Sequence, residues 1–252
     1  MSAPRKLLVT ALHKLYGLYF ATIFLLCSIT TLILLAITPG ETRRRAINRA
    51  GARMILRLTG TWPEVTGLEH LPEESSVVVA NHASYLDGVL LTAVLPHRYQ
   101  FVIKREVTSV PLMHFYLRRT GAQFVERYDA HGGARDTRRI LQAASTGASL
   151  AFFPEGTFRS EPGLRRFHNG AFTIAVRNNL VVLPVSIHGT RRVLPGNRLL
   201  PRPGRLRVVV NPGHQTVHGH TNVKEILQRC RDQILEQLDE PDHQHEHQQT
   251  GR

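Results

Sequence analysis

In VVVANHASYLDG (Val77–Gly88), four apolar residues lead directly into a polar turn that carries Asn, His and Asp side chains. A short β-branched run that ends in polar residues is typical of a strand buried on both faces of a sheet. The side chains from Asn81 onward would then lie at the carboxyl end of that strand, where open α/β sheets bind their ligands. The sequence here predicts both a buried strand and a functional site at its end.

Further short apolar runs of the same character follow along the chain: Gln100–Lys104, Ala122–Glu126, Ser149–Pro154, Val181–Ile187 and Leu206–Asn211. Helix-like segments lie between or after them: Tyr85–Ala93, Pro111–Arg119, Ala134–Ala144, Gly170–Asn178 and Thr221–Leu238. Strands that alternate with helices imply an α/β fold. We expect a mixed, largely parallel sheet flanked by helices.

The N-terminal region has a different pattern. No charged residue occurs in the 26 residues Leu15–Gly40, whose most apolar part is Phe20–Thr38. A helix needs about 20 apolar residues to cross the hydrocarbon core of a bilayer, so this run predicts a hydrophobic membrane-anchoring helix. A cleaved signal peptide fits less well, because the run is long and no A-x-A site follows it. Gly17 and several hydroxyl residues would tolerate a bend, so a helical hairpin or an in-plane anchor is the alternative to a spanning helix.

Basic residues flank the apolar run on both sides: Arg5, Lys6 and Lys14 before it, then Arg43, Arg44, Arg45, Arg49, Arg53 and Arg57 after it. With Glu41 as the one acid, residues 1–60 carry nine cations minus one anion, a net charge of +8. If the helix spans, the larger cluster predicts that its C-terminal side faces the cytoplasm, at an inner (cytoplasmic) membrane. Residues 43–57 predict a basic amphipathic helix on anionic phospholipid headgroups, with a solvated linker as the alternative.

These patterns divide the chain into three parts. Residues 1–60 form the predicted anchor and basic segment, residues 61–238 the α/β domain, and residues 239–252 a polar tail that we expect to be disordered. The tail histidines His243, His245 and His247 could bind a metal adventitiously, although the composition favours a solvated tail. The two cysteines, Cys27 and Cys230, lie far apart without metal-binding spacing, which predicts no metal site, no disulfide and a reducing compartment.

Composition excludes several classes of protein. Hydrophobic residues make up 42% of the chain and occur in blocks, which excludes full disorder, and the slightly negative mean hydropathy excludes a polytopic membrane protein. The net charge of +13 indicates an anionic partner, and residues 157–207 supply ten arginines minus one acid, or +9. Such a region would attract a phosphate headgroup, coenzyme A, an acidic carrier protein or a bilayer. Nucleic acid is not predicted, because no binding motif occurs and the cations are not interleaved with exposed aromatic residues.

His82 and Asp87 stand five residues apart in the polar turn. On one continuous helix this spacing would separate them by about 140°, so they can meet only if the chain turns between them. A His that is hydrogen-bonded to a carboxylate is held in one tautomer and becomes a better base. Taken alone, the pair would equally fit a structural His beside a helix-capping Asp.

Three other segments end apolar runs with residues that could contact a polar ligand. FPEGTFRS (Phe153–Ser160) places Glu155 between Pro and Gly in an exposed turn, with arginines close behind that could bind phosphate bidentately. GAQFVER (Gly121–Arg127) ends in a cation. LPVSIHGT (Leu183–Thr190) contains Pro184, which belongs at a sheet edge or a bulge. Each of these segments alone would also fit an ordinary surface feature.

In this order, the four segments resemble the four motif blocks of the glycerophospholipid acyltransferase family, whose bacterial type is the 1-acylglycerol-3-phosphate (lysophosphatidic acid) acyltransferase. The matching residues are Asn81, His82, Ser84 and Asp87 in the first block, Gly121, Phe124 and Arg127 in the second, Phe153–Thr157 in the third, and Pro184 in the fourth. The resemblance covers roughly Val77–Gly189, and the apolar N-terminus agrees with it.

The resemblance implies that His82 is the general base and that Asp87 orients it. His82 would remove the proton from a glycerol hydroxyl, which attacks an acyl thioester to give phosphatidic acid. The resemblance implies no acyl-enzyme and no cofactor, with acyl-CoA or acyl carrier protein as co-substrate and a lysophospholipid as acceptor. The substrate-binding residues that it implies are Asn81, Ser84, Gly121, Phe124, Arg127, Glu155, Gly156, Thr157, Arg159, His168 and Pro184. Because Glu155 is an anion, we expect it to bind a hydroxyl or to orient an Arg rather than to bind phosphate.

The sequence departs from the family pattern at two positions. The third block commonly continues as EGTRS, but Phe158 is inserted here before Arg159, and His168 stands where a basic residue is expected. The cation that binds phosphate therefore stays open among Arg159, Arg165, Arg166 and His168. The acceptor stays open too, with another lysophospholipid or an acylated amino-acid lipid as the alternative. Outside enzymes, the alternative is a membrane-surface lipid-binding protein that retains the fold.

Overall fold

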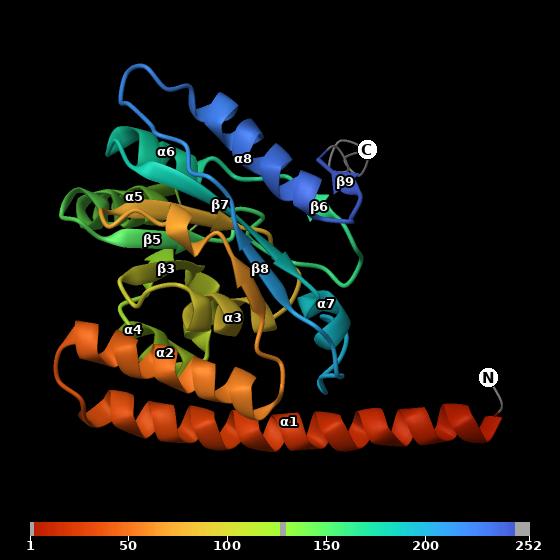
Figure 1. Ribbon diagram of the computed structural model, residues 1–252. Helices are drawn as coiled ribbons and strands as arrows, with labels where there is room; N and C mark the ends of the chain where they lie inside the picture. The colour runs from red at the N-terminus through yellow and green to blue at the C-terminus, as the bar shows by residue number, and fades with distance from the viewer. Residues whose placement is uncertain (1–2, 127–129, 245–252) are drawn as a thin grey trace.

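The computed structural model describes residues 3–126 and 130–244, and it has helices on both faces of a central sheet (Figure 1). Seven strands form this sheet in the order β1-β8-β7-β2-β5-β3-β4, and a second sheet pairs β6 with β9. The strands are β1 (Glu64–Thr66), β2 (Ser76–Ala80), β3 (Tyr99–Lys104), β4 (Gln123–Val125), β5 (Ser149–Phe152), β6 (Leu164–Arg165), β7 (Val181–His188), β8 (Arg207–Val210) and β9 (Asp242–His243). The helices are α1 (Ala3–Ile37), α2 (Glu41–Leu58), α3 (Leu86–Val94), α4 (Pro111–Arg119), α5 (Ala130–Ser145), α6 (Gly170–Arg177), α7 (Thr190–Val193) and α8 (Val223–Gln237), with 3-10 turns η1 (Leu68–His70) and η2 (Arg105–Ser109).

The sheet is mixed and largely parallel, as predicted. Strands β7, β2, β5, β3 and β4 pair in parallel, so their carboxyl ends meet at one edge. Strand β8 is antiparallel to β7, and β1 is parallel to β8. The six predicted strands and five predicted helices of the α/β domain are all present, with shifted ends. A polar group at the end of β2 therefore lies on the same edge as groups that follow β3, β4, β5 and β7.

Strand β2 explains why its sequence is apolar without alternation. Val78 and Ala80 face the core layer built with α2 and α3, whereas Val77 and Val79 face the opposite layer built with α5, α6 and α8. All five residues of the strand are buried. Helices on both faces leave no solvent side, so no polar residue is needed at alternate positions.

Pro184 lies in the interior of the sheet and not at an edge, because β7 runs between β2 and β8. It is aligned with Val79 of β2. On the other side the register shifts by one residue, because Val185 pairs with Val210 and Val182 with His214. Three residue steps along β7 therefore lie opposite four residue steps along the neighbouring segment. The bulge alternative for Pro184 therefore fits, since a proline can sit where the ladder is interrupted.

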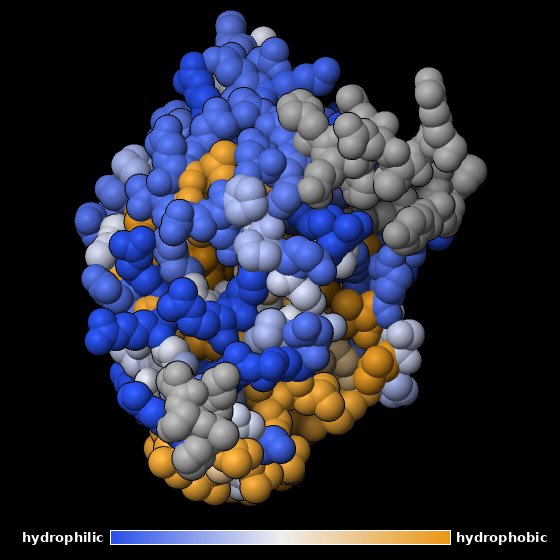
Figure 2. All heavy atoms as spheres, turned by 90° about the vertical axis from the view of Figure 1, so that its right-hand side faces the viewer, coloured by the Kyte–Doolittle hydropathy of each residue, from blue (hydrophilic) through white to orange (hydrophobic). Residues whose placement is uncertain are grey.

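Helices α1 and α2 form an antiparallel hairpin against the domain (Figure 1). Phe20 of α1 and Leu56 of α2 belong to the same core cluster as β2 and α3, so the predicted boundary at residue 60 does not separate two cores. Many apolar side chains of α1 are exposed, and Figure 2, which looks toward the N-terminal end of this helix, shows hydrophobic residues gathered at the base of the molecule. By length and composition alone, Leu7–Ile37 is the one helical segment of the described chain that could cross a membrane.

Three of the six arginines of α2 bind backbone carbonyls of the fold, whereas the prediction placed them on lipid headgroups. Arg49 and Arg53 donate to the carbonyls of Val94 and Ala93 at the end of α3, at 3.1 and 2.8 Å. Arg44 donates to the carbonyl of Arg119 at 2.7 Å. These three arginines bind carbonyls at the C-terminal ends of α3 and α4, so they hold α2 between α1 and the domain.

Residues 239–244 contact the domain, although they belong to the segment 239–252 for which a disordered tail was expected. Arg231 is only 1% exposed, and its guanidinium binds the Asp242 carboxylate, with Nη1–Oδ2 at 3.0 Å. Glu240 forms an ion pair with Arg191 at 3.0 Å. A buried guanidinium such as that of Arg231 needs an anionic partner. The contacts of Arg231 with Asp242 and of Arg191 with Glu240 therefore hold this segment against the domain. His245 and His247 lie outside the described residues, and within the described ranges no group of three possible metal ligands occurs.

Candidate active site

The polar turn after β2 brings His82 and Asp87 together. His82 lies in the turn and Asp87 in the first turn of α3, and their Nδ1 and Oδ2 atoms are 2.8 Å apart. The same Asp87 oxygen accepts the backbone N–H groups of Ala83 and Ser84 at 2.6 and 2.8 Å. The predicted turn therefore exists, and the carboxylate that closes it also holds the imidazole.

This geometry sets the chemistry of the imidazole. A carboxylate only accepts hydrogen bonds, so His82 Nδ1 carries the proton that it shares with Asp87 and Nε2 is left bare. Nε2 has no hydrogen-bond partner among the described residues, and the His82 side chain is 18% exposed. Asp87 is fully buried at the start of α3, where the helix dipole favours a negative charge. The pair can therefore take a proton from a ligand at Nε2.

Aromatic rings enclose the imidazole on two sides. Phe153 stacks on His82 with ring centroids 4.2 Å apart, and Phe158 meets it edge-on at 4.7 Å. Phe158 also contacts Tyr85 edge-on at 4.7 Å. Phe158 is the residue inserted relative to the family pattern, and its ring covers one side of the His82 imidazole. These rings fix the imidazole plane and keep water away from it.

Glu155 connects the third block to the first. Its Oε1 accepts the backbone N–H of His82 at 2.6 Å, and its Oε2 accepts that of Arg165 at 2.9 Å. Burial raises the pKa of the Glu155 carboxyl to about 7; the two N–H groups oppose this shift, and the Asp87 charge adds to it. Glu155 thus binds the backbones of a His and an Arg, whereas the sequence predicted that it binds a hydroxyl or orients an Arg.

Asn81 and Ser84 hold the turn in place. Asn81 continues the ladder beyond β2, because its side-chain amide donates to the Ile187 carbonyl at 3.0 Å and accepts the Ile187 N–H at 2.7 Å. Ser84 Oγ donates to the Leu194 carbonyl at 2.6 Å. Both side chains are buried, so the structure assigns them to positioning His82 and Asp87.

Lys104 is a residue at this edge that the sequence did not single out. It ends β3, and its Nζ donates to Oγ1 of Thr157. Thr157 follows Gly156, whose φ of 77° permits the turn after β5. The sequence feature that could have identified Lys104 is its position at the end of a predicted parallel strand, because the other site segments also follow such strands.

The four candidate phosphate-binding residues all follow the third block in the chain. Arg159, Arg166 and His168 are exposed, and Arg165 is half-buried. The His168 N–H donates to the Pro154 carbonyl at 2.9 Å, which ties residue 168 back to the third block. Together with Lys104, these residues make the neighbourhood of the turn strongly basic.

The second block lies farther along the sheet, at its β4 edge. Gly121 ends α4 with φ 75°, on the amino side of β4 and away from the carboxyl edge. Phe124 lies in β4 and lines a cavity that contains neither His82 nor Asp87. Arg127 lies outside the described residues.

Three comparisons place these findings among known proteins. A model of the acyltransferase family matches residues 63–188, half of the chain. A chloroplastic 1-acyl-sn-glycerol-3-phosphate acyltransferase of Arabidopsis thaliana is 30% identical over 178 residues, 69% of this chain and 49% of that protein. A lyso-ornithine lipid O-acyltransferase of Pseudomonas aeruginosa is 32% identical over 146 residues, 56% of this chain and 54% of that protein. The chain thus spans about half the length of these relatives.

A solved structure shares the fold. The crystal structure of the 1-acyl-sn-glycerophosphate (LPA) acyltransferase from Thermotoga maritima matches with a TM-score of 0.73 and 22% sequence identity. The match covers 92% of this chain and 95% of that chain.

Proposed function

Because this chain belongs to the acyltransferase family, we propose that it transfers a fatty acyl group from an acyl thioester to the free hydroxyl of a lysophospholipid. The acceptor that we propose first is 1-acyl-glycerol-3-phosphate, which gives phosphatidic acid. The names of the Arabidopsis and Thermotoga proteins support this acceptor. Acyl-CoA or acyl carrier protein serves as donor, and no cofactor takes part.

One observation carries the proposal: His82 Nδ1 is bound to the buried Asp87 carboxylate, and Nε2 is left bare at the carboxyl edge of the sheet. The acceptor hydroxyl gives its proton to Nε2 as its oxygen attacks the thioester carbonyl carbon. The carbon–sulfur bond then breaks, and the leaving thiolate takes the proton from Nε2. Asp87 stabilises the imidazolium that exists between these two steps.

The surrounding groups suit an anionic acceptor. Lys104 and Thr157 lie at the ends of β3 and β5, close to the arginines that follow Glu155. Ammonium and guanidinium groups bind phosphate oxygens through charge-assisted hydrogen bonds. We propose that Lys104 and Thr157 hold the acceptor phosphate with one or more of the basic residues Arg159, Arg165, Arg166 and His168.

Thioester consumption with lysophosphatidic acid tests the reaction. His82→Ala should lose on the order of 10²–10⁴-fold in kcat, since a positioned general base contributes that much. Asp87→Asn, which keeps the size of the side chain, should also lower kcat. Full activity in His82→Ala would remove the proposed base. Failure of the wild type to consume any thioester while it still binds liposomes would favour the lipid-binding alternative.

A second acceptor class has its own support. Phe158 stands where the family pattern has a cation, and one relative acts on a lyso-ornithine lipid by its name. A panel of lysophospholipids and a lyso-amino-acid lipid, each with both donors, separates the candidates. A clear preference for an acceptor without a phosphomonoester would replace phosphatidic acid as the product.

We also propose an inner-membrane location with the catalytic edge on the cytoplasmic side. The exposed apolar face of α1 supports membrane association, and the arginine excess after α1 supports the cytoplasmic side. Fractionation and protease protection of sealed vesicles test both statements.

A further inference from the structure

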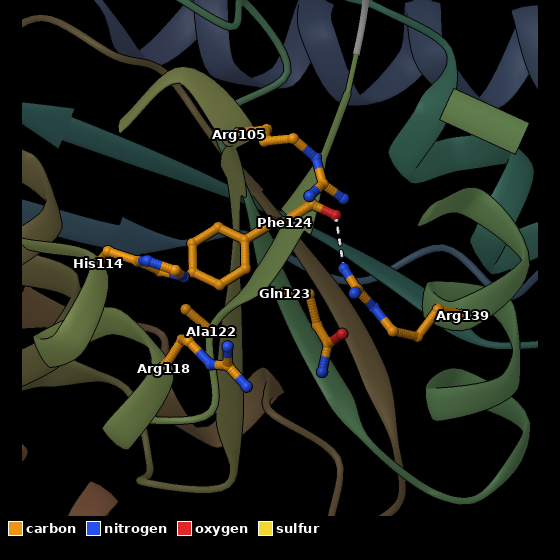
Figure 3. A pocket seen from close by; sticks show the side chains of 7 residues that line it. All are labelled: Arg105, His114, Arg118, Ala122, Gln123, Phe124 and Arg139. Atoms are coloured by element: carbon orange, nitrogen blue, oxygen red, sulfur yellow. Dashed lines mark hydrogen bonds between the residues drawn. The ribbon is translucent and has the colours of Figure 1, made fainter. Parts of the chain in front are cut away.

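A basic cavity lies at the free edge of the sheet, outside β4 (Figure 3). Its volume is about 300 Å³. The side chains around it come from α4, β4, α5 and the start of η2: Arg105, His114, Arg118, Ala122, Gln123, Phe124 and Arg139. Sites of this size hold small ligands or headgroups. Phe124 is the one lining residue that the family resemblance implies for substrate binding, and the acyl transfer proposed above assigns no role to the others.

The charges in the cavity can be counted group by group. Arg105 binds Asp136, with Nη2–Oδ1 at 2.5 Å, and lies 3.8 Å from Glu126. Arg139 donates to the Phe124 carbonyl at 2.9 Å and covers the unpaired edge of β4. Among the residues that the structure describes here, three guanidinium groups minus two carboxylates leave a charge of +1. The uncompensated group is Arg118, which has no hydrogen-bond or ion-pair partner among the described residues and is exposed.

The ring of His114 forms the wall beside Arg118. His114 and Arg118 are one helical turn apart on α4, and His114 packs edge-on against Phe124 at 5.8 Å. Figure 3 shows His114, Arg118 and Gln123 around one opening. An imidazole and a side-chain amide beside a guanidinium supply hydrogen bonds to a singly charged oxyanion.

Helix α4 also carries an apolar surface next to the cavity. The exposed side chains are Val110, Leu112, Met113 and Phe115, each 43 to 62% exposed. Arg119, the next residue after Arg118, binds the carbonyls of Leu35 and Ala36 at the end of α1, at 2.5 to 2.8 Å. Helix α4 is therefore held against the C-terminal end of α1, and it carries both this apolar patch and the cavity residues His114 and Arg118.

We propose that this cavity binds the headgroup of an anionic phosphodiester lipid of the membrane, with Arg118 on the phosphate and the lipid chains along the apolar surface of α4. One uncompensated positive charge matches the single negative charge of a phosphodiester such as phosphatidylglycerol. Arg44, Arg49 and Arg53 of α2 bind backbone carbonyls of the fold, so these three arginines are not available for the headgroup contact that we assign to Arg118. The inference does not depend on the acyl-transfer reaction.

Fluorescence quenching tests the proposal on the full chain. The chain has one tryptophan, Trp62, so Trp62→Phe with Phe115→Trp places a single reporter on α4. Brominated phosphatidylglycerol in phosphatidylcholine vesicles should quench this reporter more than brominated phosphatidylcholine does. Arg118→Gln should reduce that preference about fivefold, the effect of one basic residue near an anionic surface. Arg118→Lys should keep part of it, because the charge remains without the bidentate fork.

The matched control is Arg177→Gln. Arg177 is also an exposed arginine in the last turn of a short helix, but it lies on α6. Equal quenching by the two brominated lipids, or an equal loss in the Arg118 and Arg177 variants, would overturn the proposal. Loss of the preference on adding inorganic phosphate at constant ionic strength would show a free-anion site and would also overturn it. Thermal melts of each variant establish that the fold is kept.

Discussion

Phe158 contacts both the proposed base and a surface tyrosine, and this position makes it a testable residue. Its ring is held between His82 and Tyr85, and a Cβ added at Gly196 would meet it at 3.0 Å. An edge-on aromatic contact contributes about 0.5–1.5 kcal/mol, so Phe158→Ala should lower kcat by about twofold to tenfold as the imidazole loosens. Phe158→Leu, which keeps an apolar cover, should lose less. Steady-state kinetics that separate kcat from KM check this, and an unchanged kcat in both variants would assign Phe158 to acceptor choice alone.

Glu155 gives the site a pH dependence of known sign. Its usual pKa of 4.5 is raised by burial to about 7 in the folded protein. Between these values the unfolded chain releases the proton and the folded chain keeps it. The carboxyl therefore contributes stability that is present below pH 4.5 and is lost as the pH rises through about 7.

Glu155→Gln should remove this contribution to the pH dependence of stability. The amide does not titrate, so the difference in Tm between wild type and variant should grow smaller as the pH rises. At low pH the variant should be less stable by about 1–3 kcal/mol, because one of the two backbone N–H groups loses its acceptor. Melting curves across this pH range measure the difference, and a constant difference would contradict the raised pKa of Glu155.

At the residue scale, the sequence predicted the contact between His82 and Asp87 but not the contacts that hold this pair in place. The five-residue spacing of His82 and Asp87 required a turn, and the turn is present. The hydrogen bond from His82 N–H to Glu155 joins segments 73 residues apart, and no local pattern specifies such a contact. Lys104 has a side chain that is common on surfaces, so only the sheet order shows that it faces Thr157.

At the element scale, the contact between α1 and α2 depends on a glycine. A Cβ on Gly51 would lie 2.2 Å from Oγ1 of Thr31, a buried and branched side chain. Overpacking of this kind costs about 1–3 kcal/mol, which exceeds the gain of about 1 kcal/mol from replacing a helical Gly by Ala. Gly51→Ala should therefore destabilise the protein.

Gly88→Ala is the matched control, because Gly88 is also helical but has open space around its Cα. It should raise the free energy of unfolding by up to about 1 kcal/mol. Adding Thr31→Ala to Gly51→Ala should restore the lost stability. Denaturation in detergent measures all three variants, and an equal gain in Gly51→Ala and Gly88→Ala would show that the two helices are not in close contact.

Elements built by local periodicity were predictable, and elements built by distant partners were not. The run Val77–Ala80 predicts a buried strand, and β2 is buried on both faces. Strands β6 and β9 have two residues each and pair next to the buried guanidinium of Arg231, which binds Asp242. The pairing holds residues for which the polar composition predicted a disordered tail. Composition could not predict this, because it does not show that Asp242 binds Arg231, 11 residues away in the chain.

At the scale of the whole molecule, the packing of α1 favours an in-plane anchor over a spanning one. Contacts with the domain run along α1 from Tyr16, whose hydroxyl donates to the Thr59 carbonyl at 2.9 Å, to Leu35, whose carbonyl accepts from Arg119. These 20 positions are about the length that a spanning helix would bury in lipid. A spanning orientation would carry α2 and its arginines into hydrocarbon, at a cost of several kcal/mol for each charge left there.

Both ends of α1 should therefore lie on the same side of the membrane. Cys230 will not interfere with cysteine labelling, because burial raises the pKa of its thiol to about 12, so Cys27→Ser gives a silent background. Lys14→Cys and Thr42→Cys, placed at exposed positions on either side of the apolar run, should both react with a membrane-impermeant maleimide in inside-out vesicles and not in intact cells. Detergent should expose both thiols equally. Labelling of Lys14→Cys from outside intact cells, with Thr42→Cys reactive only in the vesicles, would establish a spanning helix and would require α1 to leave the surface on which Phe20 and Leu35 are buried.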